Sequence, residues 1–166
     1  MRTCAPLLLL LAVGCSSSAI SSTATGEGRA SARVQKLIGG EAALATIRNP
    51  DKIEAFRHAE KSYPRPLEEY EVVKGPVEVS PQLGRQLAEL LSADNSYLWD
   101  LAKGCEPDYG VRIRFTRGDQ QVNVLFCFGC DILEFLPGGK SEDFDSIRPQ
   151  LVKIVKQIFP EERFED

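Results

Sequence analysis

The chain is poor in the residue types from which catalytic sites are most often built. It has one histidine (His58), one tryptophan and one methionine among 166 residues. It contains no GxSxG motif, no HExxH motif and no glycine-rich phosphate loop. Any Ser/His/Asp or Cys/His arrangement would have to use His58, which we expect to be an ordinary, partly exposed side chain. We therefore expect a protein that is not an enzyme and holds no cofactor.

The chain also lacks an excess of positive charge and a long apolar run. It carries 20 Lys and Arg against 24 Asp and Glu, for a net charge of −4. A mildly acidic chain has no electrostatic footprint for nucleic acid, so we expect no nucleic-acid partner. The apolar run Pro6–Val13 is roughly half of the about 20 residues that a membrane-spanning helix needs. This run does not predict a transmembrane helix.

The beginning of the chain has the pattern of a secretory signal. Arg2 precedes the apolar run, as expected for a signal peptide. The run ends in Leu-Ala-Val-Gly-Cys at residues 11–15, which resembles the lipobox of bacterial lipoproteins, with Ala12 where that motif more often has leucine. The resemblance implies cleavage before Cys15, which then carries a thioether-linked diacylglycerol and an amide-linked third acyl chain. Several acyl chains give stable membrane anchoring.

The residues after Cys15 suggest where the domain is held. Ser16 resembles the sorting signal of lipoproteins of the outer membrane, which implies an outer-membrane anchor facing the periplasm. The alternatives are a soluble secreted protein that is cleaved elsewhere, or a cytosolic chain with an apolar start. Residues 15–32 are rich in Ser, Thr, Ala and Gly, which predicts a lipidated tether that reaches about 20 Å.

We predict three parts: a signal peptide at 1–14, the tether at 15–32 and one α+β domain at 33–166. The composition, 27% charged and 43% hydrophobic, is ordinary for one globular domain. The fold class is a small antiparallel sheet packed against helices.

Apolar spacing predicts the helices. A first segment spans Val34 to Ile47 and is broken by Gly39-Gly40, and another begins with Ser80 as the N-cap and Pro81 in the first turn. The clearest is a C-terminal helix capped by Asp145 or Ser146 and closed by Pro160. Its apolar face consists of Ile147, Leu151, Ile154, Val155 and Ile158.

Alternation predicts a central hairpin at 111–127. A turn at Gly118-Asp119 pairs Val111 with Phe126, Ile113 with Val124 and Phe115 with Val122, which brings the apolar residues onto one face. We expect further strands at 53–57, at 70–73 and at 132–136, the last followed by a turn at 137–139. The acidic pairs Glu68-Glu69 and Glu142-Asp143 are predicted to be solvated.

Three cysteines remain in the domain: Cys105, Cys127 and Cys130. Extending the hairpin register places Cys105 beside the other two, across a bend at Pro107-Asp108. We expect a disulfide from Cys105 to Cys127 or to Cys130, as an oxidising compartment allows. It would close a loop of some 25 residues and contribute about 3 kcal/mol.

Cys127 and Cys130 also form a CxxC motif, which leaves two alternatives open. A redox role would use Arg112 and Arg114, on the same face as Cys127, to stabilise a thiolate, but the helix that follows CxxC in thioredoxin-like proteins is missing here. A metal site would add His58, Asp108 or Asp131 to the three cysteines, without finger-like spacing.

The second half of the chain resembles uncharacterised small bacterial lipoproteins. The resemblance lies in Cys105-Glu-Pro-Asp-Tyr-Gly and in Cys127-Phe-Gly-Cys130, and it implies a shared scaffold without an activity. The sequence therefore predicts a membrane-anchored, non-enzymatic module of the cell envelope. An envelope protein would be its partner, bound through exposed aromatic residues beside the cysteines: Tyr97, Trp99 and Tyr109.

Overall fold

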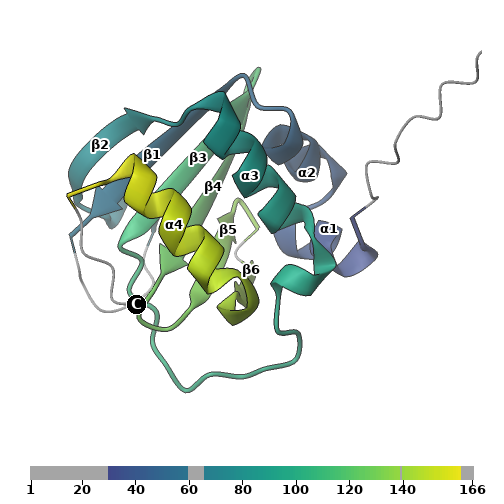
Figure 1. Ribbon diagram of the computed structural model, residues 1–166. Coiled ribbons are helices and arrows are strands. Elements are labelled where there is room, and N and C mark those ends of the chain that lie inside the picture. Colours follow the sequence, from purple (N-terminus) through teal and green to yellow (C-terminus); the bar gives the residue numbers. More distant parts are fainter. Residues whose placement is uncertain (1–29, 60–65, 139, 162–166) are drawn as a thin grey trace, which may run out of the picture.

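The alternating segments of the chain form one antiparallel sheet with helices packed on it (Figure 1). The computed structural model describes residues 30–59, 66–138 and 140–161. The six strands are arranged in the order β2-β1-β3-β4-β5-β6. They are β1 (Lys52–His58), β2 (Val72–Glu78), β3 (Val111–Arg117), β4 (Gln120–Cys127), β5 (Ile132–Leu136) and β6 (Lys140–Asp143). The predicted α+β class is confirmed.

The central hairpin has the register that its alternation predicts. Val111 pairs with Phe126, Ile113 with Val124 and Phe115 with Val122. All six side chains are buried and face the helices. The predicted strand at 132–136 is β5, which continues the sheet beyond β4.

Four helices cover the apolar face: α1 (Ala32–Ile38), α2 (Glu41–Arg48), α3 (Pro81–Ser92) and α4 (Arg148–Ile158). Figure 1 shows α3 and α4 in front of the sheet. The break between α1 and α2 lies at the predicted glycines, and Gly39 (φ +108°) adopts the left-handed conformation that ends α1. Ser80 caps α3 through its side chain. Within the described residues, no helix is long and apolar enough to cross a membrane.

α3 packs closely on the sheet because residue 84 is a glycine. A Cβ added at Gly84 would collide with Cδ1 of Ile53, in β1. The missing side chain lets the helix backbone approach the strand, and α3 thereby covers the β1 side of the core.

The structure corrects two predicted boundaries and one predicted surface. The strand predicted at 70–73 instead covers 72–78, because irregular pairing with β1 around Gly75 (φ +115°) lets the strand continue past Pro76. The N-cap of α4 is Ile147, not Asp145 or Ser146, because a 3₁₀ turn at Asp145–Ile147 precedes the helix. The pair Glu142-Asp143 is not a solvated surface: it belongs to β6, and Asp143 is buried.

A second, smaller cluster lies on the opposite face of the sheet. It contains Tyr70, Tyr109, Leu125, Cys127 and Cys130. The loop that leads from the 3₁₀ turn Asp94–Ser96 to β3 passes from the helical side to this cluster, so it joins the two faces.

Candidate functional site

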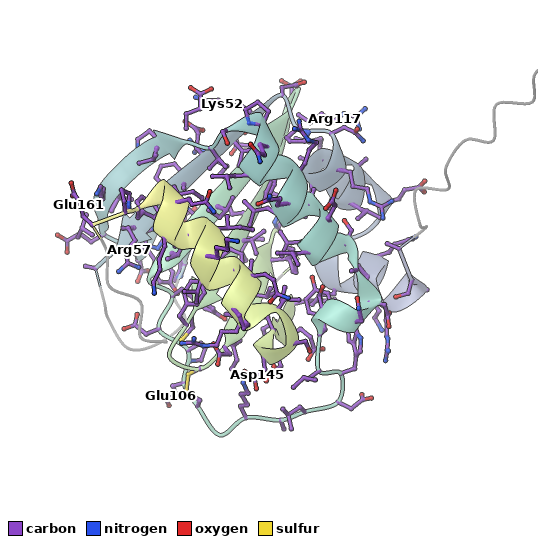
Figure 2. The ribbon with its side chains drawn as sticks, viewed as in Figure 1. Lys52, Arg57, Glu106, Arg117, Asp145 and Glu161 are labelled. Carbon is purple, nitrogen blue, oxygen red and sulfur yellow. A yellow bond between two sulfur atoms is a disulfide. The ribbon has the colours of Figure 1, made fainter. Side chains whose placement is uncertain are left out.

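The candidate site is the loop of residues 97–110, which contains no helix or strand. We call it the cysteine loop because Cys105 forms a disulfide with Cys130, across a Cα–Cα distance of 6.0 Å. This is one of the two pairings that the sequence leaves open. Cys105 lies in the loop and Cys130 follows β4, so the bond fastens the loop to the sheet. The sulfur atoms lie beside Glu106 in Figure 2.

Lys103 provides a second attachment of the cysteine loop. Its Nζ lies 2.6 Å from Asp143 Oδ2 and 2.9 Å from Asp145 Oδ1. It also donates a hydrogen bond of 2.8 Å to the carbonyl oxygen of Cys130. Burial would lower the pKa of Lys103, but the hydrogen bonds to the two carboxylates outweigh it and the pKa is raised. The ammonium group therefore ties the loop to β6 and to the turn before α4.

Backbone and side-chain bonds fix the beginning of the loop. The Tyr97 hydroxyl donates to the carbonyl of Leu91 (2.7 Å), and Trp99 Nε1 donates to the carbonyl of Asp94 (2.9 Å). The backbone N–H of Leu98 donates to the carbonyl of Asp143 (3.2 Å). Residues 97–99 are thus held against both α3 and β6.

The start of α1 contacts Asp94, in the 3₁₀ turn just before the cysteine loop, and Trp99 in the loop itself. The Asp94 carboxylate accepts hydrogen bonds from the Ser31 hydroxyl and the Arg33 guanidinium. The hydrogen bonds from Arg33 and Ser31 lower the pKa of Asp94 to about 2. The Arg33 guanidinium also lies over the Trp99 ring, 4.4 Å from its centroid. The described chain therefore begins directly beside the loop.

The prediction of exposed aromatic residues is wrong for Tyr97 and Tyr109. Tyr97 is 3% exposed and Tyr109 is 1% exposed, while Trp99 is half-buried. Tyr97 packs into the main core and Tyr109 into the smaller cluster, so neither offers a surface to a partner.

The large exposed apolar side chains of the loop are leucines, which sequence reasoning missed. Leu98 is 39% exposed and Leu101 is 50% exposed. A signal was available for Leu98: the backbone at Tyr97 is extended, so neighbouring side chains point in opposite directions. A buried Tyr97 therefore implies an outward-facing Leu98.

Cys127 is the remaining thiol in the described part of the chain, and it is 3% exposed. Its sulfur accepts a hydrogen bond from the backbone N–H of Asp108 (3.2 Å). Arg112 and Arg114, predicted to favour its thiolate, are engaged elsewhere: Arg112 stacks on Phe56 (3.9 Å) and Arg114 pairs with Glu54 (2.7 Å). Because Cys130 is bonded to Cys105, the two cysteines of the CxxC motif do not form a disulfide with each other.

His58 is buried, contrary to the prediction, with 1% of its surface exposed. It lies at the end of β1 on the second face of the sheet, where its ring stacks on Tyr70 with 5.0 Å between centroids. Nδ1 lies 3.2 Å from the carbonyl oxygen of Tyr109. Burial, reinforced by the charge of Arg112, lowers the pKa of His58 to about 4.

The residues named for a metal site do not converge. Asp131 is bonded to Arg148 (Nε–Oδ1 2.8 Å), while Asp108 contacts Cys127 through its backbone. Over the described ranges, no three His, Cys, Asp or Glu side chains are placed to hold a metal ion together. Cys15, the predicted lipid site, lies outside the described residues.

Two cavities lie apart from the cysteines, around Arg48 in α2 and Arg85 in α3. Their volumes are about 270 and 740 Å³. Acidic side chains also line them, Glu78 in one and Glu89 and Asp94 in the other, so neither cavity has a single sign of charge. We assign no ligand to them.

Comparison with protein-family models, with curated proteins and with solved structures finds no match to this chain. Its function must therefore be argued from its own residues.

Proposed function

We propose that the chain is a bacterial lipoprotein whose domain acts as a non-enzymatic module of the cell envelope, anchored through a lipid on Cys15. The cysteine loop is its interaction element. The observation that carries this proposal is that the loop is fixed by a disulfide and by Lys103, yet turns Leu98 and Leu101 toward solvent.

The disulfide supports the exported location. Bonds between cysteines form and persist in oxidising compartments such as the periplasm, and they are rare in the cytosol. The Cys105–Cys130 bond therefore agrees with the signal peptide that the sequence predicts at 1–14. The disulfide and the predicted signal peptide both favour a domain that works outside the cytoplasm.

The geometry of the cysteine loop supports an interaction role. Loops of this length without secondary structure are uncommon in small domains and often carry function. The disulfide and the hydrogen bonds already order the loop, so binding would cost little conformational entropy. Apolar side chains held at the surface by such a scaffold are typical of a contact surface.

The first test is the intact mass of the protein purified from membranes of the bacterium that expresses it. We expect a mature chain beginning at Cys15, with the mass of three acyl chains, and a further gain of two hydrogens when the disulfide is reduced. A Cys15→Ser variant is the matched control and should remain unlipidated. An unlipidated wild-type chain in the soluble fraction would contradict the proposal.

A further inference from the structure

We infer that residues 98–101 of the cysteine loop rest on the surface of the phospholipid bilayer in which the chain is anchored, so that the domain is held in one orientation. This inference depends on the lipid anchor proposed above and identifies the partner of the cysteine loop as the membrane.

The first argument is where the chain enters the domain. Ser31 and Arg33, at the start of α1, are bonded to Asp94, and Arg33 stacks on Trp99. Figure 1 shows the start of α1 close to the point where the loop leaves the turn after α3. The anchored end of the domain and residues 98–101 therefore lie at the same end of the molecule.

The second argument is the length of chain between the lipid and the domain. Cys15 and Ala30 are separated by 14 residues, and the composition of this segment predicts a reach of about 20 Å. A domain of this size has a radius of gyration of about 14 Å. On average the tether therefore holds the domain within about 20 Å of the bilayer, so the surface beside the entry point meets lipid at a high effective concentration.

The third argument is the chemistry of residues 98–101. Leu98 and Leu101 offer apolar side chains, and tryptophan, here Trp99, is enriched at the boundary between lipid and water. Two charged pairs lie nearby, Asp94 with Arg33 and Lys103 with Asp143, and Asp100 is an exposed charge within the segment itself. The paired groups do not enter the headgroup layer as isolated charges, and the Asp100 carboxylate stays in contact with the water of that layer.

The charge of this surface and of the chain indicates which lipid headgroups residues 98–101 can contact. Asp100 is exposed between Trp99 and Leu101, and the chain has a net charge of −4. Attraction to anionic headgroups is therefore not the driving force, and contact with zwitterionic lipid should be insensitive to salt.

Val72 and Val73 form a matched apolar control. They are 43% and 58% exposed and lie in β2, which Figure 1 shows on the opposite side of the domain from the start of α1. If exposed apolar surface alone led to membrane contact, these valines would serve as well as the leucines. Because the valines lie away from the anchored end of the domain, we expect that they do not contact the membrane.

Trp99 is the only tryptophan of the chain, so its fluorescence reports on this surface alone. The lipidated mature protein would be reconstituted in phosphatidylcholine vesicles whose acyl chains carry bromine near the headgroup. We expect a loss of Trp99 fluorescence relative to vesicles without bromine, at low and at high salt. The double variant Leu98→Asn/Leu101→Asn should lose this quenching while its lipid still holds it on the vesicles. The double variant Val72→Asn/Val73→Asn should keep it.

Each contrary outcome identifies what has failed. Unquenched Trp99 in protein whose mass includes the lipid would overturn the membrane contact and leave the anchor intact. A chain without lipid would overturn the proposed function and the inference with it. A photo-crosslinker at Leu101 that captures a protein instead of lipid in native membranes would also overturn the inference. Equal urea midpoints for the two double variants and the wild type would show that the domain is intact in each.

Discussion

Lys103 Nζ lies 2.6 Å from Asp143 Oδ2, and the Asp143 side chain is only 2% exposed. This ion pair joins an irregular loop to β6, the edge strand that the sequence did not predict. It also explains how an aspartate can lie inside the protein, since a buried charge is tolerated when it is paired.

Replacing Lys103 by methionine should lower the free energy of unfolding by about 3 kcal/mol, because the Asp143 carboxylate then stays buried without its partner. Urea unfolding measures this change. The double variant Lys103→Met/Asp143→Asn removes both charges and should recover most of the loss. Equal stabilities of the single and the double variant would show that the ion pair is not the cause.

Loss of the disulfide should lower the free energy of unfolding by about 3 kcal/mol, because the bond closes a loop of 25 residues in the unfolded chain. The measurement compares the wild type with Cys105→Ser/Cys130→Ser in urea. Dithiothreitol should shift the wild-type midpoint and leave that of the variant unchanged. If the wild-type midpoint is the same with and without dithiothreitol, the disulfide is inaccessible to the reductant in the native state.

His58 should make the domain less stable in mild acid. Its pKa is about 4 in the folded protein, against 6.5 as the ordinary value. Between these values the unfolded chain binds a proton that the folded protein does not. The stabilising contribution is therefore complete above pH 6.5 and is lost as the pH falls toward 4. We expect a loss of about 2 kcal/mol over this range.

The comparison that isolates His58 is with His58→Phe, which keeps a ring against Tyr70. Urea unfolding at several pH values from 7 to 4 gives the two curves. The wild type should lose more stability than the variant, because carboxylates contribute equally to both. Parallel curves would show that His58 does not titrate differently in the folded and unfolded states.

Gly84 and Ile53 should be coupled through the close contact of α3 with β1. Gly84→Ala alone should destabilise the domain by about 2 kcal/mol, because its methyl group would collide with Ile53 Cδ1. Ile53→Val removes that atom. In this background Gly84→Ala should cost almost nothing, since alanine also gains about 1 kcal/mol of helix propensity. If Gly84→Ala lowers the stability equally in the wild type and in Ile53→Val, the contact with Ile53 is not the cause of the loss.

Local patterns were sufficient to predict the elements that bury one complete face. The register of β3 and β4 follows from the alternation of Val111 to Phe126, because a shift by one residue would expose the whole apolar set. The face of α4 and the cap of α3 follow in the same way from helical spacing and from Ser80. These features depend on residues that are close in the chain.

The features that sequence reasoning missed depend on coverage by distant segments. β6 is polar, and it pairs with β5 while Lys103 neutralises Asp143. His58 and Tyr109 are buried because each packs against Tyr70, which comes from another segment of the chain. The same holds for the candidate site: three cysteines predicted a loop fastened to the sheet, but not which side chains the fastened loop would expose.

Cys127 provides the test of the alternative function, a thiol redox or metal role for Cys105, Cys127 and Cys130. The thiol is 3% exposed and packs beside Leu125, so we expect it to react with a thiol reagent far more slowly in the native protein than in urea. Intact mass after timed labelling measures the rate, and Cys127→Ala is the control that should take up no label. Reduced protein should gain fast labelling at Cys105, which lies at the surface. Rapid labelling of Cys127 in the oxidised native protein, or exchange of the Cys105–Cys130 disulfide for one that includes Cys127, would favour the redox role over a structural one.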